Sequence, residues 1–169
     1  MLASEAAQPI LAYLKEHNTA TIATRGPDGA WAAAVFYVND DGLTLFFLTD
    51  PATRHGRDMA ANSQVAATIQ EDYHDWRRIK GIQLVGKAEL VTGPLELARA
   101  WRLYLAKFPF VKDFLAAPGE FLDAYAGKMG KVRFYRLTPT RMWFSENERH
   151  FGKRDVLDCA SGEVVLAKV

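Results

Sequence analysis

The chain has 169 residues, enough to bury one sizeable hydrophobic core, and its 21 Lys and Arg nearly balance its 20 Asp and Glu. That balance leaves no broad basic surplus, so we expect neither nucleic acid nor a membrane as a partner. Cys159 is the only cysteine, which excludes an internal disulfide and a cysteine-based zinc site. The length favours a single domain over residues 1–169.

The N-terminal segment, residues 1–18, predicts a short amphipathic helix over 4–17, with Leu11 and Leu14 at helical spacing. Glu5 precedes any Lys or Arg, and no apolar stretch is long enough to cross a bilayer. These features differ from those of a secretion signal and favour a cytoplasmic protein.

Three β-strands joined by tight turns are expected next. The turn sequences are GPDG (26–29) and DDG (40–42), which are rich in the residues that turns require. The predicted strands cover 19–25, 30–39 and 43–49. Short connections of this kind indicate an antiparallel meander.

The remainder of the chain alternates helices with strands. Expected strands cover 65–71, 79–91, 131–146 and 154–166, and expected helices cover 53–61 and 94–108, the second within a helical insertion at 92–128. The apolar stripe of the second helix consists of Leu97, Trp101, Leu105 and Phe108. Because helices are inserted among more numerous strands, the pattern predicts a mainly β fold, an antiparallel barrel of six to seven strands with α decorations.

The segment TDPATRHG (49–56) opens the helix at 53–61. Thr53 suits the N-cap position, where its hydroxyl accepts a backbone N–H. Arg54 and His55 then lie at the positive end of the helix dipole, where a cation is unfavourable unless a bound anion reverses the penalty. The alternative is a plain helix cap whose arginines are neutralised by Asp50 and Asp58. The residues alone support a phosphate site and a cap about equally.

The strand at 30–39 contains the unusual run Trp31-Ala32-Ala33-Ala34. Alanine has a low β propensity and fills little space. Small side chains allow a flat ring to lie close to the strand backbone, and they equally allow one sheet to pack tightly on another. Both interpretations remain open at this point.

Two other groups of residues do not form recognisable sites. GIQLVGKA (81–88) matches the phosphate-loop pattern GxxxxGK[ST] except for Ala88, and the segment is strand-like, so we reject a nucleotide-triphosphate site. His17, His74 and His150 lack a second ligand at metal-binding spacing, so no metal site is expected. The absence of a catalytic side-chain set is consistent with chemistry carried by a cofactor.

Taken in order from about Thr19 to Lys153, these motifs resemble the pyridoxamine-5′-phosphate-oxidase-like family, the FMN-binding split β-barrels. The likeness lies in the order of TDPATRHG, AWAAAVFYV, GIQLVGKAEL and LTPTRMWF rather than in any one motif. The resemblance implies a homodimer with the flavin site at the subunit interface. The FMN-binding residues that it implies are Thr53, Arg54 and His55 at the phosphate, Thr49 at the flavin edge, Ala32, Ala33 and Ala34 along the ring, Gln83 beside the ring, and Trp143 reaching it from the second subunit.

The chain departs from the oxidase proper at two places. Trp31 replaces a basic residue, and HFGKRDVLD replaces an arginine-rich C-terminal signature, leaving Lys153 and Arg154 as the nearest basic residues. We therefore predict an FMN-dependent oxidoreductase whose small-molecule substrate is not pyridoxamine phosphate. The alternatives are a non-enzymatic flavin-binding or storage protein, a haem-binding split barrel, and the same barrel with a deazaflavin.

His55 adds a further expectation. Members of the family often carry lysine at this position, whereas histidine has a reference pKa near 6.5. The resemblance therefore implies that FMN affinity falls as the pH rises through the pKa of His55.

Overall fold

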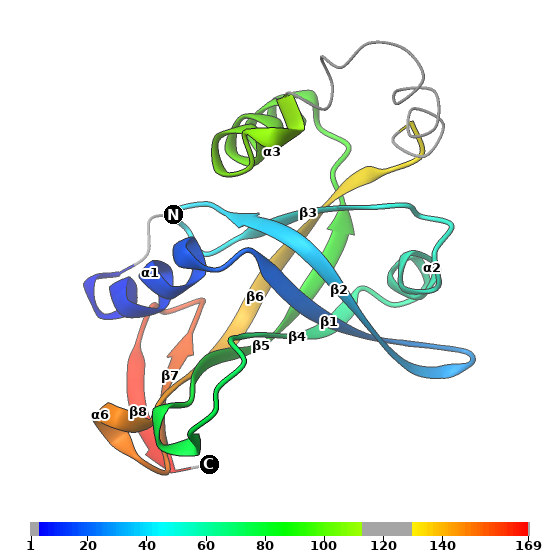
Figure 1. Ribbon diagram of the computed structural model, residues 1–169. Helices are drawn as coiled ribbons and strands as arrows, with labels where there is room; N and C mark the ends of the chain where they lie inside the picture. Colours follow the sequence, from blue (N-terminus) through cyan, green and yellow to red (C-terminus); the bar gives the residue numbers. More distant parts are fainter. Residues whose placement is uncertain (1–3, 113–129, 169) are drawn as a thin grey trace.

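The computed structural model describes residues 4–112 and 130–168. Its strands form one antiparallel sheet in the order β3-β2-β1-β4-β5-β6-β7-β8, and a further pairing of β3 with β6 closes the first six into a barrel (Figure 1). The strands are β1 (Thr19–Gly26), β2 (Gly29–Asn39), β3 (Leu45–Thr49), β4 (Gln64–Gln70), β5 (Lys80–Leu90), β6 (Arg133–Glu146), β7 (Lys153–Asp158) and β8 (Val164–Lys168). The helical elements are η1 (Glu5–Ala7), α1 (Gln8–Glu16), α2 (Arg54–Ala61), η2 (Trp76–Arg78), α3 (Pro94–Lys107) and α6 (Asn147–His150). The predicted mainly β, antiparallel barrel with helical additions is confirmed.

The barrel strands could be predicted from the sequence because buried and exposed side chains alternate along them. Along β1, every second side chain is buried, as a strand with one face on the core requires. The hairpin between β1 and β2 turns at Gly29, whose φ of +93° lies in the region that favours glycine. Among the described helices, none has the length and apolar character needed to cross a membrane.

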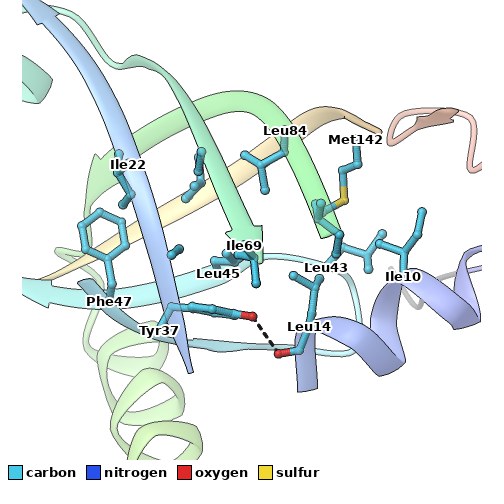
Figure 2. Packing of buried hydrophobic residues seen from close by; sticks show 14 of the residues in the cluster. Ile10, Leu14, Ile22, Tyr37, Leu43, Leu45, Phe47, Ile69, Leu84 and Met142 are labelled. Carbon is cyan, nitrogen blue, oxygen red and sulfur yellow. Dashed lines mark hydrogen bonds between the residues drawn. The ribbon is translucent and has the colours of Figure 1, made fainter. Parts of the chain in front are cut away.

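Helix α1 closes one end of the barrel. Ile10 and Leu14 point from α1 into the interior, toward strand residues that include Met142 (Figure 2). The buried hydroxyl of Tyr37 donates to the Leu14 carbonyl oxygen at 2.9 Å, so this polar group keeps a partner inside the core. The N-terminal helix is therefore part of the barrel core.

Helix α3 packs a second, smaller core against β2, β3 and β6. The α3 residues buried there are Ala100, Tyr104 and, at the C-cap, Phe108. The predicted stripe was wrong in part, because Leu97 is 36% exposed and Trp101 and Leu105 are only partly buried. The small side chain of Ala100 allows the helix to approach the sheet closely, which rotates the buried face away from the larger residues.

The C-terminal region also differs from the prediction. Residues 154–166 were expected as one strand, whereas the chain forms the hairpin β7–β8, which extends the sheet beyond the barrel (Figure 1). The carboxylate of Asp158 accepts backbone N–H groups of Ala160 and Ser161, and Gly162 has a φ of +74°, so these residues form a turn. The part of the predicted helical insertion at 113–128 lies outside the described residues.

Candidate functional site

The N-terminus of α2 is capped as the sequence predicted. The Thr53 hydroxyl accepts the Gly56 N–H at 3.1 Å and donates to the Asp50 carbonyl oxygen at 2.7 Å. Among the described residues, no hydrogen bond engages the backbone N–H groups of Arg54 and His55. These two donors lie at the positive end of the helix dipole and are available to an anion.

A buried carboxylate anchors α2 to the barrel. Asp58 is 5% exposed and accepts the Thr24 hydroxyl at 2.8 Å. A Cβ at Gly26 would lie 1.9 Å from Asp58 Oδ1, so only glycine fits beneath the carboxylate. The alternative, in which Asp50 and Asp58 neutralise the arginines, is not supported, because neither carboxylate forms an ion pair within the described residues.

Two threonines surround the ring of His55. Its Nε2 atom lies 2.5 Å from Thr49 Oγ1 and 3.2 Å from Thr53 Oγ1, with Thr49 at the end of β3. Burial lowers the pKa of His55, and the negative charge of Asp58 partly opposes this shift. The predicted phosphate-site residues Thr53 and His55 are therefore in contact, and Thr49, predicted at the flavin edge, also contacts the His55 ring. Burial favours the neutral form of this histidine.

Arg54 reaches away from this cluster toward the β1–β2 hairpin. Its guanidinium carbon lies 4.7 Å from the centre of the Trp31 ring, and Nη2 donates to the Asp28 carbonyl oxygen at 2.8 Å. Its Nε atom is buried and has no hydrogen-bond partner among the described residues. A buried guanidinium N–H without an acceptor is costly, and a bound anion would remove that cost.

The alanine run lies on β2, on two faces of the barrel wall. Ala32 and Ala34 are exposed on the outer face, whereas Ala33 pairs with buried Ile22 on the inner face. Neighbouring outer positions on β1 and β4 are also small, and they include Ala23 and Ala66. The outer wall thus has a shallow surface of small side chains, which leaves room for a flat ring or for another protein surface.

One cross-strand row joins this surface to the other predicted ring contacts. The row runs Ala34, Thr21, Thr68, Gln83 and Trp143, through successive paired positions on β2, β1, β4, β5 and β6. Side chains at paired positions share one face of the sheet. Gln83 and Trp143 are therefore neighbours on the same outer face as Ala34.

Gln83 and Trp143 line an open groove of about 490 Å³ together with Arg154. Arg154 Nη1 donates to Gln83 Oε1 at 2.5 Å, which fixes both side chains at the edge of the groove. The remaining floor includes small residues of the outer face, Ala23, Ala66 and Thr68. Within the part of the chain that the structure describes, the groove combines an apolar floor and an aromatic wall with one cation.

The predicted residues thus form two groups within one chain. The first group consists of Thr49, Thr53 and His55, with Arg54 next to it in the sequence. The second group consists of Gln83 and Trp143. Among the described residues, no hydrogen bond or ring contact joins the two groups. From Ala34 to Trp143 the row crosses four strand intervals, roughly 19 Å along the surface. That span exceeds the length of one tricyclic ring.

The histidines considered for haem or metal binding are dispersed. Both ring nitrogens of His17 already have partners, the Tyr13 carbonyl oxygen at 2.7 Å and Glu71 at 2.8 Å. His74 is exposed in the loop before η2, and His150 ends α6. Within residues 4–112 and 130–168, no three His, Cys, Asp or Glu side chains converge on a common point as a metal site would need.

Comparison with known proteins identifies the family. The sequence pattern of the pyridoxamine 5′-phosphate oxidase family matches residues 6–146. The chain belongs to that family. A UPF0306 protein of Photorhabdus laumondii is 39% identical over 111 residues, covering 64% of this chain and 76% of that protein.

Solved structures share the fold. A haem-binding protein from Mycobacterium smegmatis has a TM-score of 0.71 at 20% identity, and the match covers 96% of this chain and 61% of that one. HutZ, the haem storage protein from Vibrio cholerae, has a TM-score of 0.59 at 21% identity, covering 82% of this chain and 91% of that one. These likenesses establish the split β-barrel, and the chain spans only about three fifths of the mycobacterial protein.

Sequence reasoning missed two contributors to the site. Arg154 was noted only as a basic residue, and its contact with Gln83 depends on the register of β7 against β6, which the sequence does not encode locally. Asp58 was considered only as a local counter-charge to the arginines, although it is the buried anchor of α2. The sequence did contain a signal for this role: Asp58 lies about one helical turn after Arg54, on a helix that buries one face.

Proposed function

We propose that this chain is an FMN-dependent oxidoreductase that acts on a small molecule other than pyridoxamine phosphate. The observation that carries the proposal is the arrangement at the start of α2. There, two unengaged backbone N–H groups begin the helix that carries the Thr49–His55–Thr53 cluster, and Arg54, whose Nε has no partner among the described residues, extends from the same helix end toward the β1–β2 hairpin. Such a set of donors suits a phosphate dianion. Membership of the pyridoxamine 5′-phosphate oxidase family supports FMN as the molecule that carries it.

In this proposal, the chain's own residues bind and orient the cofactor. Thr53 and the α2 N–H groups hold the phosphate, and Arg54 supplies a permanent positive charge. Ala32, Ala33 and Ala34 offer strand backbone and little bulk beside the ring. Bound FMN supplies hydride transfer at its N5 position, and the protein sets the access of the substrate and of water.

The distance between the two groups of residues supports a homodimer. Along the curved sheet, four strand intervals of roughly 4.8 Å lie between Ala34 and Trp143, a longer path than one flavin ring covers. We infer that the phosphate and alanine residues of one protomer face the Gln83–Trp143–Arg154 groove of its partner. Packing of the exposed small-residue surface against that partner would also remove it from water.

Arg154 is the residue that we assign to the polar edge of the ring. Its hydrogen bond to Gln83 positions a cation in the groove, where it would stabilise negative charge on a reduced flavin. Lys153, which precedes it, is exposed and remains outside the groove. The two basic residues noted in the sequence therefore have different roles in the proposal.

The proposal is tested by adding cofactors to the purified protein. We expect FMN to bind with a stoichiometry of one per chain and with a change in its visible spectrum, and riboflavin to bind far more weakly. Failure to bind FMN in a fluorescence titration would overturn the flavin site. Bound FMN that neither NADH nor NADPH reduces, and that after chemical reduction passes its electrons to no added small-molecule acceptor faster than free reduced FMN does, would favour a storage protein over an enzyme.

The same titration separates the other cofactors. The fold shared with the haem-binding protein of Mycobacterium smegmatis is the observation that favours haem. A Soret band on haem addition, without FMN binding, would support that function. Binding of a deazaflavin in competition with FMN would show that the ring site accepts either cofactor.

The pH dependence of FMN binding tests the role of His55. Burial lowers its pKa in the free protein, whereas a nearby phosphate dianion would favour the imidazolium and raise the pKa in the complex. FMN affinity should therefore fall as the pH rises from the free-state pKa to the complexed pKa and be flat above it. Because the free-state pKa lies below the reference value near 6.5, the rise in affinity on acidification should continue below pH 6.5.

Comparison with His55→Gln isolates this effect from the titration of the FMN phosphate itself. The ratio of wild-type to variant affinity, measured by fluorescence titration between pH 5 and pH 8.5, should increase as the pH falls. A constant ratio would show that His55 contributes no charge to the complex.

A further inference from the structure

A second groove adjoins the Gln83–Trp143–Arg154 groove, and of the residues proposed to hold FMN its described lining includes only Trp143. It has a volume of about 590 Å³ and lies between β5, β6 and the β7–β8 turn. Trp143 and Val85 line both grooves and form the wall between them. Pro139, Cys159 and Ala160 complete an apolar lining on the far side of this wall.

A β-bulge creates this groove. Val85 pairs with Arg141 and Gly86 pairs with Pro139, so Thr140 is an extra residue on β6 without a partner on β5. The Thr140 hydroxyl donates to the Val85 carbonyl oxygen, and its own carbonyl oxygen accepts the Cys159 N–H. The bulge is therefore held by hydrogen bonds on both sides and is a defined part of the fold.

Among the described residues that line this groove, Arg141 is the one cation. Its nearest carboxylate oxygen is Asp158 Oδ2, at 3.8 Å, which is too long for a hydrogen bond, and its side chain is 54% exposed. Asp158 is instead engaged by its own turn, because its Oδ1 accepts the N–H groups of Ala160 and Ser161. Among the described residues, the Arg141 guanidinium makes no hydrogen bond, so its donors are available beside an apolar surface.

We propose that this groove binds a planar apolar molecule that carries a single carboxylate. Arg141 holds the carboxylate, and the ring lies against Trp143 and Pro139. The single guanidinium, already close to the negative charge of Asp158, suits a monoanion better than a phosphate dianion. If FMN occupies the neighbouring groove, this ligand lies across the Trp143 wall from it, in the place of a substrate or effector. The groove itself does not require FMN.

The test uses 2-naphthoate as the probe and 2-naphthamide as its uncharged analogue, with binding followed by ligand-observed NMR titration. We expect naphthoate to bind with a Kd on the order of 1 mM and naphthamide to bind at least about fivefold more weakly. Arg141→Gln should weaken naphthoate by about fivefold or more and leave naphthamide unchanged. Arg102→Gln removes the same charge from an exposed position on α3 and should leave both affinities unchanged.

Two further arms distinguish this groove from its neighbour. Arg154→Gln should leave naphthoate binding unchanged, and Arg141→Gln should leave the FMN titration unchanged. Equal affinity for naphthoate and naphthamide, or loss of naphthoate binding in Arg154→Gln but not in Arg141→Gln, would overturn the proposal. The comparison of the two probes on the wild-type protein needs no variant to fold, and the FMN titration reports separately on the flavin site.

Discussion

Replacing Arg54 by alanine should raise the Kd for FMN roughly 10- to 150-fold, while the Kd for riboflavin stays within about twofold. The range corresponds to about 1.5–3 kcal/mol, the usual contribution of a hydrogen bond to a charged group. Riboflavin shares the ring but lacks the phosphate, so the difference between the two ligands isolates the phosphate contact. Both constants are obtained by fluorescence titration.

The structure gives two reasons to expect a large effect. Arg54 begins α2, where the free N–H groups of the helix also lie, and its buried Nε has no acceptor among the described residues. Stacking on Trp31 and the bond to the Asp28 carbonyl oxygen restrict the guanidinium before any ligand arrives. A preorganised donor loses little conformational entropy on binding, so more of its interaction energy appears as affinity.

Arg57→Ala is the matched control. Arg57 lies on the same helix, one turn further on, and its guanidinium donates to the Ala52 carbonyl oxygen. Its removal changes the charge of α2 equally but should change the Kd for FMN by less than about threefold, as expected for an exposed charge. Equal losses in the two variants would indicate a general electrostatic effect and would remove Arg54 from the site.

Features that depend on residues close together in the sequence were predictable, whereas features that depend on distant strands were not. Local signals located the start of α2, because Thr53 caps the helix through a contact three residues away. The strands of the barrel were predicted from alternation and turn residues, which are also local. The family resemblance then ordered these pieces into the correct fold.

The outer face of the barrel was much less predictable. Gln83, Trp143 and Arg154 come together through the pairings of β5 with β6 and β6 with β7, and Gln83 lies 60 residues from Trp143 and 71 from Arg154 in the sequence. A one-residue change of register would move each side chain to the opposite face, and the sequence contains no local record of that register. The alanine run was similarly ambiguous, because exposure of Ala32 and Ala34 depends on what packs outside the barrel.

Replacing Gly86 by alanine should lower the free energy of unfolding by about 2–3 kcal/mol, which for a chain of this size lowers Tm by about 5–10 °C. A Cβ at this position would lie 2.3 Å from the Thr138 carbonyl oxygen and 2.8 Å from the Pro139 Cα. Both atoms belong to the backbone, so no side chain can rotate to make room. Chemical denaturation with urea measures the change.

The same substitution should disturb the groove beside Trp143, because Gly86 is the β5 residue that pairs across the bulge at Thr140. We expect Gly86→Ala to weaken naphthoate binding under conditions where the protein remains folded, since β6 must move to accept the methyl group and Arg141 moves with it. Gly81→Ala is the control on the same strand: its Cβ would lie 3.1 Å from the Ile69 carbonyl oxygen, and the expected loss is below about 1 kcal/mol. Equal stability of the two variants would show that β5 and β6 are less closely packed at the bulge than these distances require. Loss of stability with unchanged naphthoate binding would show instead that the bulge does not position Arg141.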